Sequence, residues 1–164
     1  MQIEKINTYN LIVKKTLNSF QTKTDRERDL IDSALHNLKK GNVVIYVLVE
    51  NITMFGFVSV SVNKLISKDF ALPSIEIDYL FVDKRYRGKF LVKNQKASDF
   101  LLGFVEKLAK KLKNDVGIRS IILYPDKQDD NLIKFYSNLG FQKEKIIFWN
   151  KQRKREFWMI RKIN

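Results

Sequence analysis

The sequence predicts an α+β fold, a mixed and mostly antiparallel β-sheet with helices on its faces. Three observations indicate this class. Two β-branched runs flank Asn51, which is the pattern of an antiparallel hairpin. A strand, a helix and another strand follow between Ile75 and Tyr124, which implies one parallel pair. Two further β-type runs end the chain as a second hairpin.

The N-terminal part is expected to form one short strand and two helices. Ile3–Ile6 is the candidate strand, and Asn10–Phe20 is the first candidate helix. Asp25–Lys40 is the second, because apolar residues recur there at helical spacing and Gly41 follows as a stop signal. The apolar positions are Leu30, Ile31, Ala34, Leu35 and Leu38.

The middle of the chain is expected to contain three strands. Asn42–Glu50 and Thr53–Val62 are rich in β-branched and aromatic residues and form the first hairpin. Gly56 inside the second run indicates a bulge or a close approach of another backbone. Lys64–Pro73 is expected to be a loop, and Ser74–Val82 the next strand.

The remaining elements are two helices and three strands. One face of a long helix is marked by Ala97, Leu101, Phe104, Leu108 and Leu112. Ile118–Tyr124 is expected to be a strand, and Asn131–Leu139 a helix that Gly140 ends. Phe141–Trp149 and Arg155–Lys162 are the strands of the final hairpin.

Composition excludes several classes of protein. The chain of 164 residues, 45% of them hydrophobic, is expected to form a single domain over residues 1–164 and not a disordered tail. With no cysteine, disulfides, thiolate nucleophiles and cysteine-ligated metals are excluded. The single histidine, His36, excludes a multi-histidine metal centre, so no metal is predicted. A Ser-His-Asp triad would have to use His36, which we interpret as a structural helix residue.

No membrane partner is expected. The longest dense apolar run, Val43–Val49, is far too short to cross a bilayer. The segment Met1–Ile6 has no apolar signal core, so a cytoplasmic location is expected.

The formal charge of +13 predicts an anionic partner, and it lies mostly in two blocks. Lys84–Lys96 contains six basic residues and no acidic ones, while Lys143–Lys162 contains eight basic and two acidic residues. Within the second block, Trp149–Trp158 interleaves basic residues with tryptophan. That pattern suits RNA through phosphate contacts and stacking, or it is a solvated turn between strands with core aromatics.

Two motifs carry the functional signal. The strand Ile75–Val82 runs into a basic turn, Asp83–Lys89, which contains Gly88 and leads to the long helix. Backbone N–H groups at such a turn and at a helix start can hold a phosphate. The second motif is Asn131–Phe141, with its Phe135-Tyr136 pair and a later Gly-Phe.

Together these motifs resemble the GNAT superfamily of N-acetyltransferases, in order and spacing, from about Ile75 to Phe141. The matching residues are Leu80-Phe81-Val82-Asp83, Arg87-Gly88, Leu101-Leu102, and Asn131 with Phe135-Tyr136 and Gly140-Phe141. One departure follows Gly88, where the family's next glycines are missing and the turn is about six residues longer. Ala97 and Ser98 are small enough to replace the closing glycine or alanine.

The resemblance implies a splayed parallel strand pair with acetyl-CoA as co-substrate, its pantetheine along the first strand. The positions implied for CoA are Leu80, Phe81, Val82, Arg87, Gly88, Lys89, Ala97, Ser98, Asn131 and Tyr136. Arg85, Lys93 and Lys96 are further candidates for its phosphates, and a solvated basic loop is the alternative. Asn131 is expected to contact CoA, to cap its helix, or both.

The resemblance also implies catalytic residues. Tyr136 matches the family's usual general acid toward the CoA sulfur, and a core aromatic is the alternative. Glu76 and Asp78 are the candidate bases, because period two directs both to one face of a strand. The alternatives are an exposed polar strand face and a water-mediated route.

Three functions stay open. The first is acetylation of a primary amine on a small molecule or protein. The second is a toxin-like enzyme that acetylates aminoacyl-tRNA, suggested by the basic hairpin and by Gly117-Ile118-Arg119. The third is a non-catalytic binding module that has kept the fold. A homodimer is a further expectation, and a DNA-binding function is disfavoured because no zinc or helix-turn-helix pattern is present.

Overall fold

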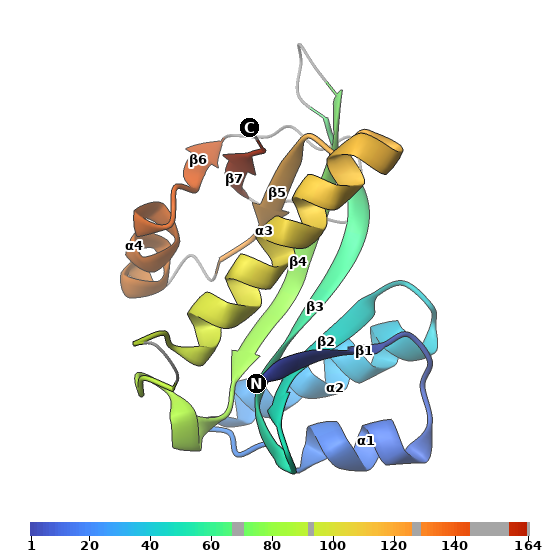
Figure 1. The fold of residues 1–164 in the computed structure, drawn as a ribbon, viewed down its shortest axis with the longest axis vertical. Helices are drawn as coiled ribbons and strands as arrows, with labels where there is room; N and C mark the ends of the chain where they lie inside the picture. The colour runs from blue at the N-terminus through green and yellow to red at the C-terminus, as the bar shows by residue number, and fades with distance from the viewer. Residues whose placement is uncertain (67–70, 92–93, 126–128, 145–157, 164) are drawn as a thin grey trace. The chain divides into compact units, whose positions relative to one another are not determined.

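The computed structural model describes residues 1–66, 71–91, 94–125, 129–144 and 158–163, and it confirms the α+β class (Figure 1). The strands are β1 (Gln2–Ile6), β2 (Val44–Glu50), β3 (Thr53–Ile66), β4 (Ala71–Val82), β5 (Ser120–Leu123), β6 (Gln142–Glu144) and β7 (Trp158–Lys162). The helices are α1 (Leu11–Asn18), α2 (Asp25–Lys39), α3 (Ala97–Val116) and α4 (Asp130–Asn138), with a 3₁₀ turn, η1, at Lys84–Tyr86.

The strands pair in the order β1-β2-β3-β4-β5-β7-β6. The predicted parallel pair is β4–β5, in register from Ser74 opposite Ser120 to Ile77 opposite Leu123. The pairs β1–β2, β2–β3, β5–β7 and β6–β7 are antiparallel. The recorded parallel register ends at Ile77, whereas β4 continues to Val82.

The chain divides into two compact units. Unit 1 comprises Met1–Ser61 and Asp78–Val105, and unit 2 comprises Val62–Ile77 and Glu106–Asn164. The single domain expected over residues 1–164 stays a prediction.

Unit 1 is built around an apolar core between α1, α2 and one face of β2–β4. Phe20 lies at its centre, with ring centroids 5.8 Å from Phe57 and 5.6 Å from Phe81. On β2, Ile45 and Val47 point into this core. Tyr46, between them, contacts Phe104 of α3 at 4.6 Å, because successive side chains of a strand point to opposite faces. Helices therefore cover both faces of the sheet within unit 1.

The two N-terminal helices begin at side-chain caps. Asn10 Oδ1 accepts a hydrogen bond from Val13 N at 2.8 Å, and Thr24 Oγ1 accepts one from Glu27 N at 3.3 Å. Each cap satisfies an N–H group that has no partner within its helix. At the other end of α2, Gly41 adopts a φ of 71°, which glycine tolerates without strain and which explains the stop.

Both features expected at Gly56, a bulge and a close approach of another backbone, are confirmed. The β2–β3 register shifts between Leu48, opposite Gly56, and Val49, opposite Met54, so Phe55 of β3 is the extra residue of a bulge next to Gly56. A Cβ added at Gly56 would collide with the carbonyl oxygen of Phe81 and lie 3.0 Å from Val82 Cα. The glycine thus permits close approach of the β4 backbone.

Both predicted boundaries of the loop Lys64–Pro73 are wrong, because strand residues occupy each end of this segment. Strand β3 runs to Ile66, four residues beyond Val62, and β4 begins at Ala71. Lysine and proline, the residue types of Lys64 and Pro73, are depleted in strands, but pairing between β3 and β4 overrides this preference. The carbonyl of Pro73 accepts a hydrogen bond from Arg119 N at 2.8 Å, so this segment belongs to the sheet.

Unit 2 has its own apolar cluster. Ile122, Trp158 and Ile160 are buried together, with Leu72 and Tyr124 packed against them. The final hairpin is confirmed as an antiparallel β6–β7 pair with Gln142 opposite Ile160. The other residues expected in its strands, and the basic turn between them, lie outside the described residues.

Candidate functional site

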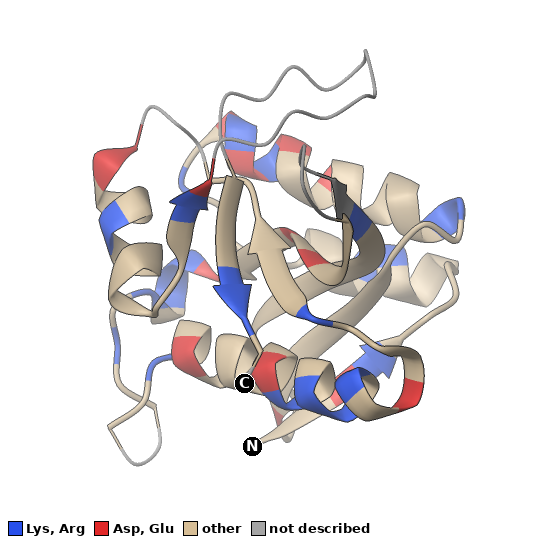
Figure 2. Cartoon of the chain, turned by 90° about the horizontal axis from the view of Figure 1, so that it is seen from above, with Lys and Arg blue, Asp and Glu red and all other residues tan. Residues whose placement is uncertain are grey.

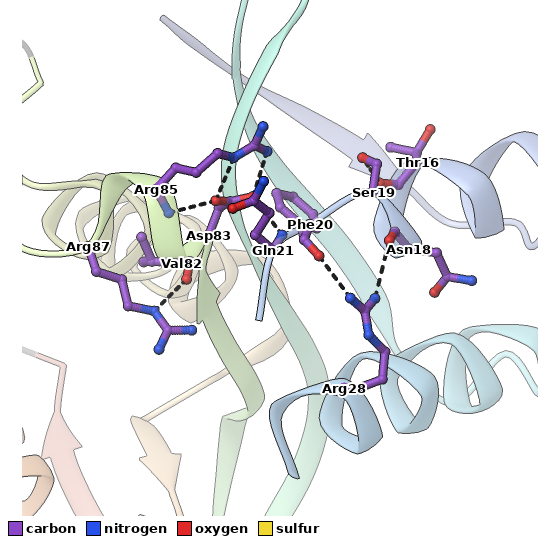
Figure 3. A network of polar contacts seen from close by, with 10 residues as sticks. All are labelled: Thr16, Asn18, Ser19, Phe20, Gln21, Arg28, Val82, Asp83, Arg85 and Arg87. Atoms are coloured by element: carbon purple, nitrogen blue, oxygen red, sulfur yellow. Dashed lines mark hydrogen bonds and ion pairs between the residues drawn. The ribbon is translucent and has the colours of Figure 1, made fainter. Parts of the chain in front are cut away.

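At the end of β4, Asp83 joins three segments of unit 1 (Figure 3). Its carboxylate accepts hydrogen bonds from the Arg85 guanidinium at 2.7 and 2.9 Å, and from Arg85 N at 2.8 Å. It also accepts one from Gln21 N at 2.9 Å, while Asp83 N donates to Phe55 O. Burial by itself raises the pKa of Asp83, but these donors outweigh it and hold the pKa below its usual value. Asp83, fully buried, is therefore a structural anion.

Arg87 is held in a comparable way. Its guanidinium forms two hydrogen bonds with Glu27, at 2.6 and 2.9 Å, and its Nε donates to Val82 O at 2.7 Å. It also lies 5.2 Å from the ring centre of Phe81. The contact with CoA phosphate predicted for Arg87 stays a prediction, and such a contact would compete with Glu27 for the guanidinium.

The long insertion after Gly88 folds back on itself. Gly88 has a φ of 71°, and Asn94 has a φ of 57°. Phe90 and Lys96 form an isolated β-bridge, and Leu91 N donates to Gln95 O at 2.8 Å. The Lys96 ammonium lies 5.5 Å from the Phe90 ring centre. The described residues on the two sides of the insertion therefore pair with each other just before the start of α3. Lys89 is exposed, and Lys93 lies outside the described residues.

The first turn of α3 carries the two small residues expected to replace glycine. Ala97 is buried and Ser98 is half-buried, and both stand in the helical turn whose N–H groups have no intrahelical acceptor. The Asp99 carboxylate accepts a hydrogen bond from Lys96 N at 2.9 Å, the contact that closes a capping box. The helix start therefore offers N–H groups of the kind that bind a phosphate.

The predicted pantetheine strand has one buried and two half-buried residues. Phe81 belongs to the unit 1 core, so its side chain serves packing. Leu80 and Val82 are half-buried. Any contact of Phe81 with a ligand would have to come from its backbone.

Tyr136 lies on α4 in unit 2, and it is 6% exposed. Its ring packs edge-on against Phe135 at 5.2 Å and Phe141 at 5.8 Å between centroids. Burial raises the pKa of Tyr136 to about 12, so the phenol stays protonated at neutral pH. A protonated phenol is a donor, as the general-acid hypothesis requires.

The helix carrying Tyr136 is capped by a residue that the sequence patterns did not reveal. Asp129 Oδ1 accepts a hydrogen bond from Leu132 N at 3.1 Å, so Asp129 is the N-cap. The prediction that Asn131 caps its helix is wrong, because α4 begins one residue before it. The side chain of Asn131 is exposed, and its contact with CoA stays a prediction.

The two candidate bases have different environments. Glu76 is 3% exposed, lies opposite Ile122 in the parallel pair, and accepts a hydrogen bond from Asn63 at 2.7 Å. The alternative interpretation, in which Glu76 belongs to an exposed polar face of the strand, is therefore wrong. Asp78 is half-buried and stands just beyond the recorded parallel register.

A cavity of about 530 Å³ lies in unit 1 beside α2. Tyr79 of β4 contributes to its lining, and the remaining residues come from α2. They are Asp29, Asp32, Ser33, His36 and Asn37. The helical spacing of these polar residues was present in the sequence, but only the position of β4 makes them one wall of a cavity. His36 is exposed on this wall and lies outside the core, and its interpretation as a structural helix residue stays a prediction.

Charged residues of both signs occur along the described parts of the chain. Figure 2 shows basic and acidic residues interspersed along the helices, whereas the strands are mostly uncharged. The described residues contain no group of three or more histidine or acidic side chains placed to hold a metal ion. None of the helices described is long and apolar enough to cross a membrane.

No protein-family model and no curated protein matches the chain in sequence. Solved structures do match its fold. The toxin AtaT, as a tyrosine-to-phenylalanine mutant with the antitoxin AtaR C-terminus and acetyl-CoA, matches 99% of this chain and 92% of its own. The TM-score is 0.72 at 15% identity. AtaT complexed with acetyl-methionyl-tRNAfMet gives 0.68, also at 15% identity, over 98% of this chain and 94% of its own.

A similar match is found with KacT. A tyrosine-to-phenylalanine mutant of KacT gives a TM-score of 0.67 at 15% identity, over 99% of this chain and 96% of its own. The chain has the GNAT fold of these proteins, with its mostly antiparallel sheet and one parallel pair.

Proposed function

We propose that this protein is an acyl-CoA-dependent N-acetyltransferase that transfers an acetyl group from acetyl-CoA to a primary amine. The observation that carries the proposal is the fold match over 99% of the chain with a toxin whose structure includes acetyl-CoA. Tyr136 supports the proposal with a buried, neutral phenol, at the position that the motif resemblance assigns to the general acid.

The turn and the start of α3 fit a phosphate group. Gly88 takes a conformation that favours glycine, and the first-turn N–H groups of Ala97 and Ser98 lie in a helix of 20 residues. We assign these residues to the CoA phosphates, with Leu80, Phe81 and Val82 along the pantetheine. The exposed side chains of Lys89 and Asn131 are available for further contacts.

The proposed reaction is direct attack in a ternary complex. The neutral amine nitrogen attacks the thioester carbonyl, the new C–N bond forms, and the C–S bond breaks. Holding both reactants in place is worth about 7–11 kcal/mol at most. Glu76 or Asp78 takes the proton that the ammonium group loses before the attack, and Tyr136 gives its proton to the departing sulfur. The nitrogen loses a second proton as the amide forms, and this proton returns to the Tyr136 oxygen through solvent. Each proton-transfer role is typically worth about 10²–10⁴-fold.

Aminoacyl-tRNA is the second candidate acceptor. The fold match with AtaT complexed with acetyl-methionyl-tRNAfMet supports it, as do the 31 basic residues of this chain. An RNA acceptor predicts strong salt dependence, because each neutralised phosphate releases counterions.

Two measurements test the proposal. Millimolar CoA should raise the melting temperature of the chain, since a ligand that binds only the native state stabilises it. Acetyl transfer should then be assayed with small amines, peptides and charged tRNA. Tyr136→Phe should lower kcat by about 10²-fold with an unchanged melting temperature, because it removes the donor and keeps the ring.

Three results would contradict parts of the proposal. No thermal shift with CoA would support a non-catalytic module. Full activity in Tyr136→Phe would exclude the phenol as the acid. No acetylation of charged tRNA, together with no growth defect on expression, would exclude the toxin-like alternative.

A further inference from the structure

Asn63 lies one residue past the predicted end of β3, and it contacts the buried candidate base. Its amide nitrogen donates to Glu76 Oε2 at 2.7 Å. Asn63 belongs to β3 and Glu76 to β4, and both are in unit 2. Sequence patterns did not indicate this pair, because they placed Asn63 at the edge of a loop.

The orientation of the Asn63 amide is determined by a second contact. Its Oδ1 accepts a hydrogen bond from Lys64 N at 2.8 Å. Turning the amide over would place its NH₂ group against that N–H, and its oxygen against the carboxylate of Glu76. Both contacts would then be repulsive, so the backbone of Lys64 fixes Asn63 as a donor to Glu76.

We propose that Asn63 is a positioning residue that orients the Glu76 carboxylate for removal of the proton from the acceptor amine. This inference rests on the proposed acetyl transfer. Glu76 is 3% exposed, so solvent contributes little to holding its carboxylate in place. The hydrogen bond from a rigid strand restricts rotation of the carboxylate, and a misplacement of about 1 Å can cost about 10²-fold in rate.

A purely structural hydrogen bond would give a different result. Loss of such a bond would lower the melting temperature of the variant and leave kcat per folded molecule unchanged. A positioning bond acts on kcat through Glu76 alone. The kinetic effects of Asn63 and Glu76 substitutions must therefore be non-additive.

The test compares Asn63→Leu, Glu76→Gln and the double variant, with the exposed Asn114→Leu on α3 as a matched control. Asn63→Leu keeps much of the volume and removes the donor. We expect it to lower kcat by about 10–100-fold, with KM for acetyl-CoA within about twofold. The double variant should be no slower than Glu76→Gln alone, and Asn114→Leu should have the kcat of the wild type.

Asn63→Ser is the second variant, in case the leucine variant does not fold. It shortens the side chain and should lower kcat in the same direction. Unchanged kcat in the folded Asn63 variants, additive losses in the double variant, or full activity in Glu76→Gln would each overturn the inference. If the wild type shows neither a CoA thermal shift nor acetyl transfer, the proposed function and this inference both fail. An active wild type with unaffected Asn63 variants refutes the inference alone.

Discussion

Strand β4 leads into one buried carboxylate and carries another, Asp83 at its end and Glu76 near its middle. Asp83 is 0% exposed and Glu76 is 3% exposed. The Asp83 carboxylate accepts hydrogen bonds from the guanidinium and the backbone N–H of Arg85 and from the backbone N–H of Gln21. The Glu76 carboxylate accepts a hydrogen bond from the side-chain amide of Asn63, on the neighbouring strand.

The contacts of Asp83 indicate a structural role for its charge. Protonation of Asp83 would break an ion pair and release two backbone N–H groups from a carboxylate. Asp83 therefore suits a permanent structural charge. The family-like motif Leu80-Phe81-Val82-Asp83 ends in this residue. The contacts of its carboxylate indicate that the aspartate serves the fold and not catalysis. Glu76 stays a candidate base of the proposed reaction, with the Asn63 amide as one donor to its carboxylate.

The strongest test of this comparison is Glu76→Gln. It should lower kcat by about 10²–10⁴-fold, because the amide cannot accept the proton, while the free energy of unfolding changes little. Steady-state kinetics and urea unfolding on the same preparation measure both quantities. Asp78→Asn is the control for the second candidate base. A larger kcat loss in Asp78→Asn than in Glu76→Gln would assign the base to Asp78.

Asp83→Ala should lower the stability of the protein and leave kcat unchanged. It leaves Gln21 N and Arg85 N without their acceptor, so the free energy of unfolding should fall by about 2–4 kcal/mol. The remaining folded protein should keep the kcat of the wild type. Arg85→Gln is the matched control, with a smaller loss of about 1 kcal/mol, because the Arg85 side chain is 45% exposed. Equal losses in the two variants would show that the N–H groups contribute little.

The pH dependence of stability should test the structural role of the Asp83 charge. The pKa of Asp83 in the folded state lies below its unfolded value, since Arg85 and the backbone donors outweigh burial. Its stabilising contribution is complete above the unfolded pKa of about 3.9, and is lost as the pH falls through the folded pKa. The wild type should therefore lose its advantage over Asp83→Asn below about pH 4. The loss should be at most about 1.4 kcal/mol per pH unit, measured by urea unfolding. An advantage that stays constant down to pH 2 would contradict this account.

The smallest expected effect concerns the turn after Asp83. Glu27→Gln removes the ion-pair partner of Arg87, whose side chain is 34% exposed, and should cost about 0.5–1 kcal/mol of stability. If Arg87 also binds a CoA phosphate, Glu27→Gln should lower KM for acetyl-CoA by freeing the guanidinium. Arg87→Leu should then raise that KM several-fold. The same KM in both variants would restrict Arg87 to a structural role.

Local patterns in the sequence predicted most elements correctly. Runs rich in β-branched and aromatic residues predicted β2 and much of β3, and the apolar spacing of α2 predicted its extent to within one residue. Gly56 indicated the bulge, because a glycine inside a strand often marks irregular pairing or a close backbone approach. Wrong boundaries occurred at Lys64–Pro73 and at Asn131, where pairing between strands and the cap by Asp129 decided the outcome.

By itself, the sequence determined the α+β class, the order of its elements and the acetyltransferase-like motifs, because these depend on residues close together in the chain. Only the tertiary structure decided what each polar side chain does. Arg87 meets Glu27 from 60 positions away, and Glu76 meets Asn63 from 13. Such partners depend on strand register and helix placement, which follow from packing of the whole core. One strand and the turn that follows it therefore present one carboxylate that holds the fold together and another that we propose as a base.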